Sequence, residues 1–226
     1  MEKLNGSIKF TKICDEWLLF KRPRVKESTY SNYKFTIDRY LKVDFRQAVL
    51  ESLVDYDFNL YIEKLQKKLA SKTIRKLGII LKSILRYAER KYDYDFKLDL
   101  MSLPSIEQKE IEIFNDKERL KLERKILKTR EIKELGILTS LYSGLRIGEV
   151  CALRWSDINF EDKLINITHT LQRVYVDRMD TKVIIGNPKT QKSIRKIPIA
   201  KPLLSKLKEI QPYYPKEAYI LTRQNR

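Results

Sequence analysis

Apolar side chains recur at every third or fourth position over most of the first 92 residues. This spacing places them on one face of an α-helix and therefore predicts amphipathic helices. The pattern covers residues 8–20, 29–41, 55–69 and 71–92, with Ser28 and Ser71 as candidate N-caps of the second and fourth helices. Gly and Pro, at 6 and 7 in 226 residues, are too scarce for a many-turned β-sandwich. The pattern predicts a compact helical domain over residues 1–92.

The pattern of apolar and polar residues changes twice after this domain. Residues 93–112 mix charges, lose periodicity and include Pro104, so they are predicted to be a linker. In the second domain, residues 113–226, Asn115 or Asp116 can cap a helix that ends near 128, and further helices are expected over 137–143, from about 146 and over 201–210. Alternation of apolar and polar residues predicts short antiparallel strands over 164–171, 182–186 and 193–199. The expected fold class is mainly α with a small antiparallel β-sheet (α+β).

The chain is strongly basic, with 47 Lys and Arg against 30 Asp and Glu and a formal charge of +17. Such a charge favours a polyanionic partner, of which nucleic acid is the commonest, although a solubility surface or a membrane-surface protein would share it. Residues 62–92 hold ten basic and two acidic side chains. Six of the cations lie on the polar face of the fourth helix, where they could contact DNA phosphates or form an ordinary solvated face: Lys72, Arg75, Lys76, Lys82, Arg86 and Arg90.

Several classes of protein are disfavoured by composition. Cys14 and Cys151 are the only cysteines and are far apart in sequence, which argues against a disulfide framework. One histidine and no zinc-type spacing argue against a metal site, and we expect no cofactor. The N-terminus lacks the apolar core of a signal peptide, and no apolar run could span a bilayer. We expect a cytoplasmic protein with no membrane contact.

The densest chemical signal lies in residues 143–160, SGLRIGEVCALRWSDINF. Gly144 permits a tight turn, after which Arg146 stands at the start of a helix with its guanidinium free to point into a cleft. Glu149 follows three residues later on the same helical face and can hold that guanidinium in place. A second signal is PKTQKSIRKIPI, residues 188–199, in which Lys189 occupies a turn between two predicted strands. A lysine there can reach a substrate phosphate or donate a proton to a leaving oxygen.

Together the two segments resemble the tyrosine recombinase, or phage integrase, family, in the form typical of Gram-positive integrative elements and phages. The first matches the family's arginine box, S-G-L-R-x-G-E-x-x-x-L-x-W-x-D-I, and the second its lysine segment, P-K-T-x-x-S-x-R-x-I-P. The resemblance implies a helical core-binding (SAM-like) domain over 1–92 and part of a catalytic domain over 113–226. It implies that Arg146 clamps the scissile phosphate, that Glu149 orients Arg146 and that Lys189 protonates the departing 5′-oxygen. It also implies double-stranded DNA as partner, a tetramer on DNA and no metal. The fragment alone could be a monomer.

The sequence departs from the family pattern downstream of Lys189. The expected H-x-x-R box and the nucleophilic tyrosine that follows it are not found. His169 precedes Lys189 and is expected to be a strand residue. Three tyrosines precede the place where the box should stand and are interpreted as packing or surface aromatics: Tyr213, Tyr214 and Tyr219. We therefore expect a C-terminally truncated recombinase that binds DNA but does not cleave it alone. The alternatives are a non-catalytic regulator or decoy derived from an integrase and a basic helical protein with no DNA role.

Overall fold

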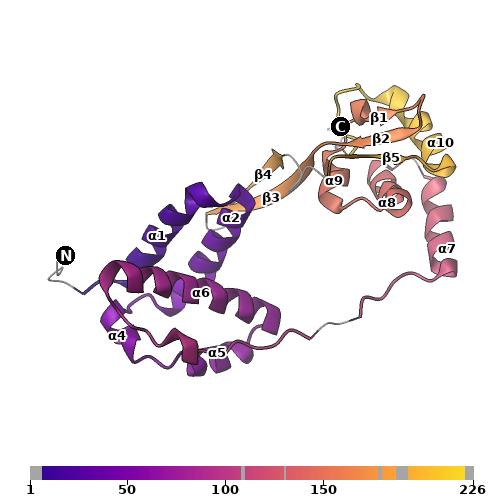
Figure 1. The fold of residues 1–226 in the computed structure, drawn as a ribbon. Helices are drawn as coiled ribbons and strands as arrows, with labels where there is room; N and C mark the ends of the chain where they lie inside the picture. Colours follow the sequence, from indigo (N-terminus) through magenta and orange to yellow (C-terminus); the bar gives the residue numbers. More distant parts are fainter. Residues whose placement is uncertain (1–6, 108–109, 130, 178–179, 187–192, 222–226) are drawn as a thin grey trace. The chain divides into compact units, whose positions relative to one another are not determined.

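The computed structural model describes residues 7–107, 110–129, 131–177, 180–186 and 193–221 (Figure 1). The pattern of contacts within the chain separates it into two compact units. The first unit comprises Met1–Glu110 and Val174–Lys182, and the second comprises Ile111–Arg173 and Val183–Arg226. The predicted class, mainly α with small antiparallel sheets, is confirmed. Within these described ranges, no helix combines the length and the apolar character needed to cross a membrane.

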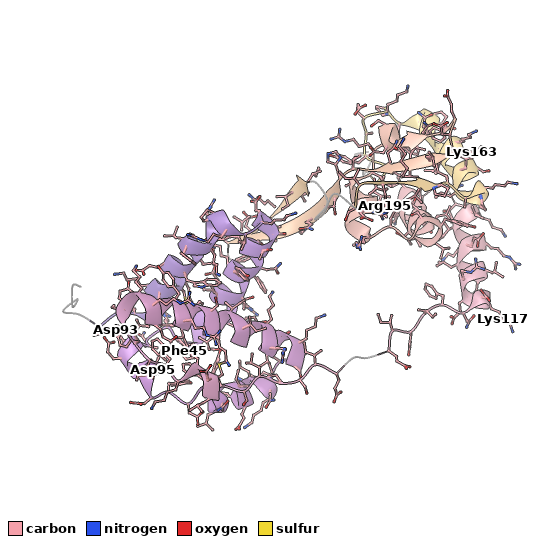
Figure 2. All side chains as sticks on the ribbon, in the orientation of Figure 1. Phe45, Asp93, Asp95, Lys117, Lys163 and Arg195 are labelled. Atoms are coloured by element: carbon pink, nitrogen blue, oxygen red, sulfur yellow. The ribbon has the colours of Figure 1, made fainter. Side chains whose placement is uncertain are left out.

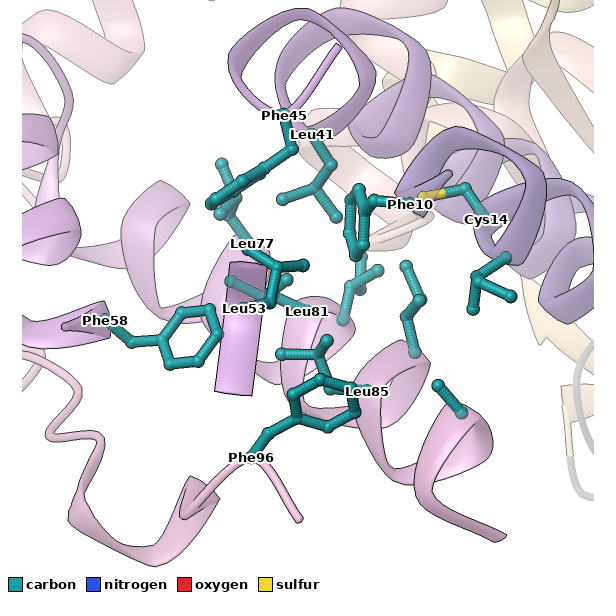
Figure 3. Packing of buried hydrophobic residues seen from close by; sticks show 14 of the residues in the cluster. Phe10, Cys14, Leu41, Phe45, Leu53, Phe58, Leu77, Leu81, Leu85 and Phe96 are labelled. Atoms are coloured by element: carbon teal, nitrogen blue, oxygen red, sulfur yellow. The ribbon is translucent and has the colours of Figure 1, made fainter. Parts of the chain in front are cut away.

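The helices of the first unit enclose one apolar core. They are α1 (Phe10–Lys21), α2 (Glu27–Thr36), α3 (Lys42–Asp44), α4 (Leu50–Val54), α5 (Phe58–Gln66) and α6 (Ser71–Tyr92), with short 3₁₀ turns at Arg22–Arg24 and Leu98–Leu100 and a π-helical turn, Ile37–Leu41, after α2. Figure 3 shows Phe10 and Leu41 packing near Leu77 and Leu81 of α6, all of them fully buried. The predicted periodic positions thus form this core, and the short helices α3 and α4 were not anticipated.

Two predicted helix starts were wrong by a residue or two. The second helix begins at Glu27 after Lys26 instead of being capped by Ser28, and Ser71 is the first residue of α6 instead of its cap. The N-cap positions are occupied by Lys26 and Ala70, which make no side-chain cap hydrogen bond, so the sequence carries no capping signal at either start.

The predicted linker from residue 93 is wrong in its first part. Phe96, Leu98 and Met101 are each less than 5% exposed and belong to the core of the first unit. The chain turns back after α6 through Asp93 and Lys97, both with positive φ (58° and 49°), and runs along that helix. We call residues 96–104 the return segment. Leu103 packs against Gly78 of α6, where an added Cβ would meet its side chain at 2.3 Å.

The second unit combines helices with a three-stranded antiparallel sheet. Its helices are α7 (Asp116–Leu127), α8 (Ile132–Ser143), α9 (Ile147–Ala152) and α10 (Lys201–Ile210). The sheet order is β1 (Ile158–Asn159), β2 (Leu164–Ile167), β5 (Arg195–Pro198), and Ile165 of β2 pairs with Ile197 of β5. Asn115 caps α7 as predicted, because its side chain accepts the Glu118 N–H while Glu118 accepts the Asn115 N–H.

The remaining strands, β3 (Thr170–Asp177) and β4 (Asp180–Gly186), form a two-stranded sheet. Val174–Lys182 of this pair are grouped with the first unit, and Tyr175 and Lys182 contact α2. Ser31 Oγ donates to the backbone oxygen of Tyr175 at 2.9 Å, and the ring of Tyr175 packs edge-on against Phe35 at 5.2 Å. Lys182 forms an ion pair with Glu27 at 2.5 Å.

Candidate functional site

Arg146 is placed by a tight turn between two helices. Gly144 ends α8 in the left-handed conformation (φ 63°), and its N–H donates to the Ser140 carbonyl at 3.0 Å. Leu145 is buried, whereas the next residue is exposed. Arg146 then becomes the N-cap residue of α9, and its side chain is 77% exposed. The turn therefore places Arg146 at the start of a helix, as the sequence predicted, with its guanidinium exposed to solvent, whereas its orientation into a cleft stays a prediction.

Glu149 is a buried carboxylate directly behind this arginine. The residue is only 4% exposed. Its Oε2 accepts the backbone N–H of Arg146 at 3.0 Å, and its Oε1 accepts from Arg146 Nη1 at 3.3 Å. The predicted contact at spacing i, i+3 is thus present, and the same carboxylate satisfies a backbone donor that the helix start leaves unpaired.

The structure adds a third member, Arg195 of β5, which the sequence interpretation did not single out (Figure 2). Its Nη2 donates to Glu149 Oε2 at 2.9 Å and its Nη1 donates to Oε1 at 3.1 Å, a two-pronged contact. These hydrogen bonds are the main reason why the pKa of Glu149 is lowered, and they raise the pKa of Arg195. Arg195 shares a strand face with Ile197, whose partner Ile165 is buried. An arginine on the inward face of an alternating strand was the signal that could have revealed an acidic partner.

Gly148 allows α9 to approach β3 closely. A Cβ at this position would lie 2.7 Å from the backbone oxygen of Leu171 and 2.7 Å from Thr170 Oγ1. No side chain can occupy that space without moving backbone, so glycine is required for the close packing of α9 on this strand. Gly148 of the arginine box therefore serves to position the helix that carries Glu149.

The six cations predicted on α6 divide into two sets. Three contact the return segment: Arg75 Nη1 donates to the Pro104 carbonyl at 3.2 Å, Lys82 Nζ donates to the Met101 carbonyl at 2.8 Å, and Arg86 lies 3.7 Å from Asp99. We call these three the inner set. The other three, which we call the outer set, are Lys72, Lys76 and Arg90, of which Lys76 donates to Asn32 Oδ1 of α2 at 3.3 Å. The helix does not present all six on one open face.

The remaining residues weighed from the sequence are Lys189, His169 and three tyrosines. Lys189 is among the residues that the structure does not describe. His169 was expected to be a strand residue, but it lies in the exposed connection between β2 and β3. Its Nδ1 lies 2.8 Å from Thr168 Oγ1. The three tyrosines are an exposed Tyr213, a Tyr214 whose ring stacks on Trp155 at 5.8 Å, and a Tyr219 whose hydroxyl accepts from Arg154 at 3.1 Å. Among the described residues, no three His, Cys, Asp or Glu side chains gather as a metal site.

Comparison with known proteins identifies the family. The model of the "Phage integrase family" matches residues 106–225, which is more than half of the chain. The chain belongs to the phage integrase family. It is similar to "Tyrosine recombinase XerC-like" from Caldanaerobacter subterraneus, with 30% identity over 81% of this chain and 50% of the relative. It is also similar to "Transposase from transposon Tn916" from Enterococcus faecalis, with 27% identity over 84% of this chain and 47% of the relative. It therefore spans about half the length of the curated relatives it matches.

The fold is shared with solved integrases. The Tn1549 transposon integrase, solved in complex with transposon right end DNA, superimposes with a TM-score of 0.73 at 19% identity, over 96% of this chain and 72% of that one. This likeness shows a common fold over nearly the whole chain. The family and the Gram-positive transposon and phage type inferred from the two motifs are confirmed.

Proposed function

We propose that this chain is the part of a site-specific recombinase that binds DNA and contacts the scissile phosphate. The whole recombinase breaks and rejoins duplex DNA through a phosphotyrosine intermediate. The observation that carries the proposal is the exposed Arg146 guanidinium held from behind by the buried Glu149 carboxylate. A planar guanidinium that is anchored on one edge keeps its other donors in a fixed fork, which suits two non-bridging phosphate oxygens. In this role Arg146 stabilises the charge of a pentacoordinate phosphorus in the transition state.

Lys189 completes the proposed chemistry as the general acid that protonates the departing 5′-oxygen. The support for this role is its place in the lysine segment of the family motif. Arg195 belongs to the same segment and contacts Glu149, so the described end of that segment adjoins the arginine turn. In the proposed reaction Arg146 neutralises the charge of the phosphate, so no metal ion is needed for that role.

Double-stranded DNA is the proposed partner, and the outer set on α6 is its proposed phosphate contact in the first unit. The outer-set residues Lys72 and Arg90 are exposed and have no ion pair among the described residues, so each can release a condensed counterion when it meets a phosphate. The inner set is proposed to contribute less, because its charges are directed to the return segment. Assembly into a tetramer on DNA remains part of the proposal for the whole recombinase.

The 226 residues by themselves are proposed not to cleave DNA. Tyr214 and Tyr219 are each engaged in another contact, and the H-x-x-R box is not found in this sequence. Covalent catalysis needs a nucleophile with a base within reach. A regulator derived from an integrase would show the same lack of cleavage.

Two measurements test the proposal. A gel-shift series on duplex DNA in rising salt should show binding that weakens steeply, and no binding even at low salt would overturn the DNA-binding role. Incubation with a nicked suicide substrate, followed by a denaturing gel, should show no covalent adduct. An adduct would overturn the statement that these residues lack a nucleophile.

A further inference from the structure

The Glu149 carboxylate is shared unequally between two arginines. Arg195 makes the two shorter contacts from its side chain, at 2.9 and 3.1 Å, one to each oxygen. Arg146 contributes one side-chain contact at 3.3 Å and a backbone N–H at 3.0 Å. With the residue only 4% exposed, these four donors satisfy the carboxylate.

We propose that Arg195 is a positioning residue for the recombinase reaction, which acts by occupying the Glu149 carboxylate so that the Arg146 guanidinium stays available to a DNA phosphodiester. This inference rests on the proposed role of Arg146 and goes beyond it, because it assigns a function to a residue that does not touch the substrate.

The physical reason is competition for one anion. A buried carboxylate must be compensated by hydrogen bonds or by opposite charge. If Arg195 were absent, Arg146 would be the remaining arginine in contact with Glu149, and its exposed side chain could turn inward to form the two-pronged pair itself. A guanidinium engaged in that way has fewer donors left for a phosphate. Arg195 prevents this by making the stronger pair, and it is itself 30% exposed, with Nη1 also held by the Ser193 carbonyl at 3.0 Å.

The arrangement predicts an unusual pattern in a double-mutant cycle. Replacing Arg195 with Gln should weaken phosphodiester binding although Arg146 is intact. Replacing Glu149 with Gln as well removes the competing negative charge but keeps an amide oxygen that can accept from Arg146. The guanidinium should then stay positioned, and binding of the phosphodiester should recover. A purely structural tie between β5 and α9 predicts the opposite, because the double variant would then bind no better than Arg195→Gln.

The experiment uses the 226-residue chain labelled with ¹⁵N and follows the Nε–Hε signal of Arg146, assigned by its loss in Arg146→Lys. The probe is a thymidine dinucleotide with one phosphodiester. We expect its affinity to fall roughly tenfold in Arg195→Gln and to return to within about threefold of the original in the double variant. Arg195→Lys, which keeps the charge but loses the fork, should be intermediate. Lys196→Gln is the matched control, since it removes one charge from the exposed face of β5 and should not change the affinity.

The outcomes separate the two proposals. If the Arg146 signal of the original chain does not respond to the probe, the proposed phosphate-binding role fails. If it responds, but equally in Arg195→Gln, or if the double variant does not recover, the positioning role fails. Thermal melting of each variant shows whether it is folded. If Arg195→Gln is not folded, Arg195→Lys decides: unchanged affinity would overturn the positioning role.

Discussion

The division of the α6 cations predicts that two substitutions of equal charge will differ in their effect on DNA binding. One variant replaces the outer set with glutamine and the other replaces the inner set, so each loses three positive charges from the same helix: Lys72, Lys76 and Arg90 in the first, and Arg75, Lys82 and Arg86 in the second. Each phosphate contact contributes about 0.9 to the slope of log K against log salt. Loss of three contacts should therefore make the slope shallower by up to about 2.7 in the outer variant.

The inner variant should instead lose stability. Its contacts to the return segment include one of 2.8 Å from Lys82 and one of 3.2 Å from Arg75, while the pair of Arg86 with Asp99 is largely exposed. Partly exposed charged hydrogen bonds of this kind contribute roughly 1–2 kcal/mol in total.

The assay is fluorescence anisotropy on one duplex at several salt concentrations, with urea unfolding of each variant as the companion measurement. We expect a shallower salt slope with near-original stability for the outer variant, and a nearly unchanged slope with lower stability for the inner variant. Equal changes of slope in the two variants would refute the division of the cations into two sets.

Three further predictions follow from buried groups. Phe96→Ala should lower the free energy of unfolding by about 3–5 kcal/mol in urea, because the return segment is part of the core. Cys151 should be alkylated by iodoacetamide in the folded protein while Cys14 is not, because burial raises the pKa of the Cys14 thiol and covers it. The stability difference between the original chain and Glu149→Gln should shrink in acid. The pKa of Glu149 is lowered in the folded state, so its stabilisation is present above about pH 4.3, the ordinary value, and is lost as the pH falls through the folded value.

Each of these has a clear contrary result. If Phe96→Ala lowers the free energy of unfolding by less than about 1 kcal/mol, residues 96–104 are a linker and not part of the core. Equal alkylation rates for the two cysteines would contradict the packing around α1. A Glu149→Gln stability difference that stays constant from pH 7 to pH 3 would show that the carboxylate is not held by the arginines.

The helices and strands could be predicted because each is defined by a local pattern. Apolar periodicity identifies α1, α5 and α6, and alternation identifies β2 and β5, since these patterns depend on neighbours a few residues apart. The return segment could not be found in this way. Phe96, Leu98 and Met101 follow no regular period, and the turn back depends on left-handed conformations at Asp93 and Lys97, for which the sequence offers no glycine.

The candidate site was predictable where its residues are close in sequence. The contact of Arg146 with Glu149 follows from their spacing of three on one helix start. Arg195 lies 46 residues from Glu149, and only the packing of β5 near α9 brings them together. The α6 cations show a related limit, because periodicity reveals which face is buried but not that another segment covers part of the polar side.

The proposed role of Arg146 is tested most directly by asking whether its side chain binds one particular DNA phosphate. A duplex selected from a random-sequence library for tight binding would be rebuilt with single neutral methylphosphonates at successive positions. We predict that one position weakens binding by the original chain roughly tenfold and has no further effect on Arg146→Gln, because the same contact is already missing. If every methylphosphonate weakens the two proteins equally, Arg146 does not bind a specific phosphate and the account is wrong.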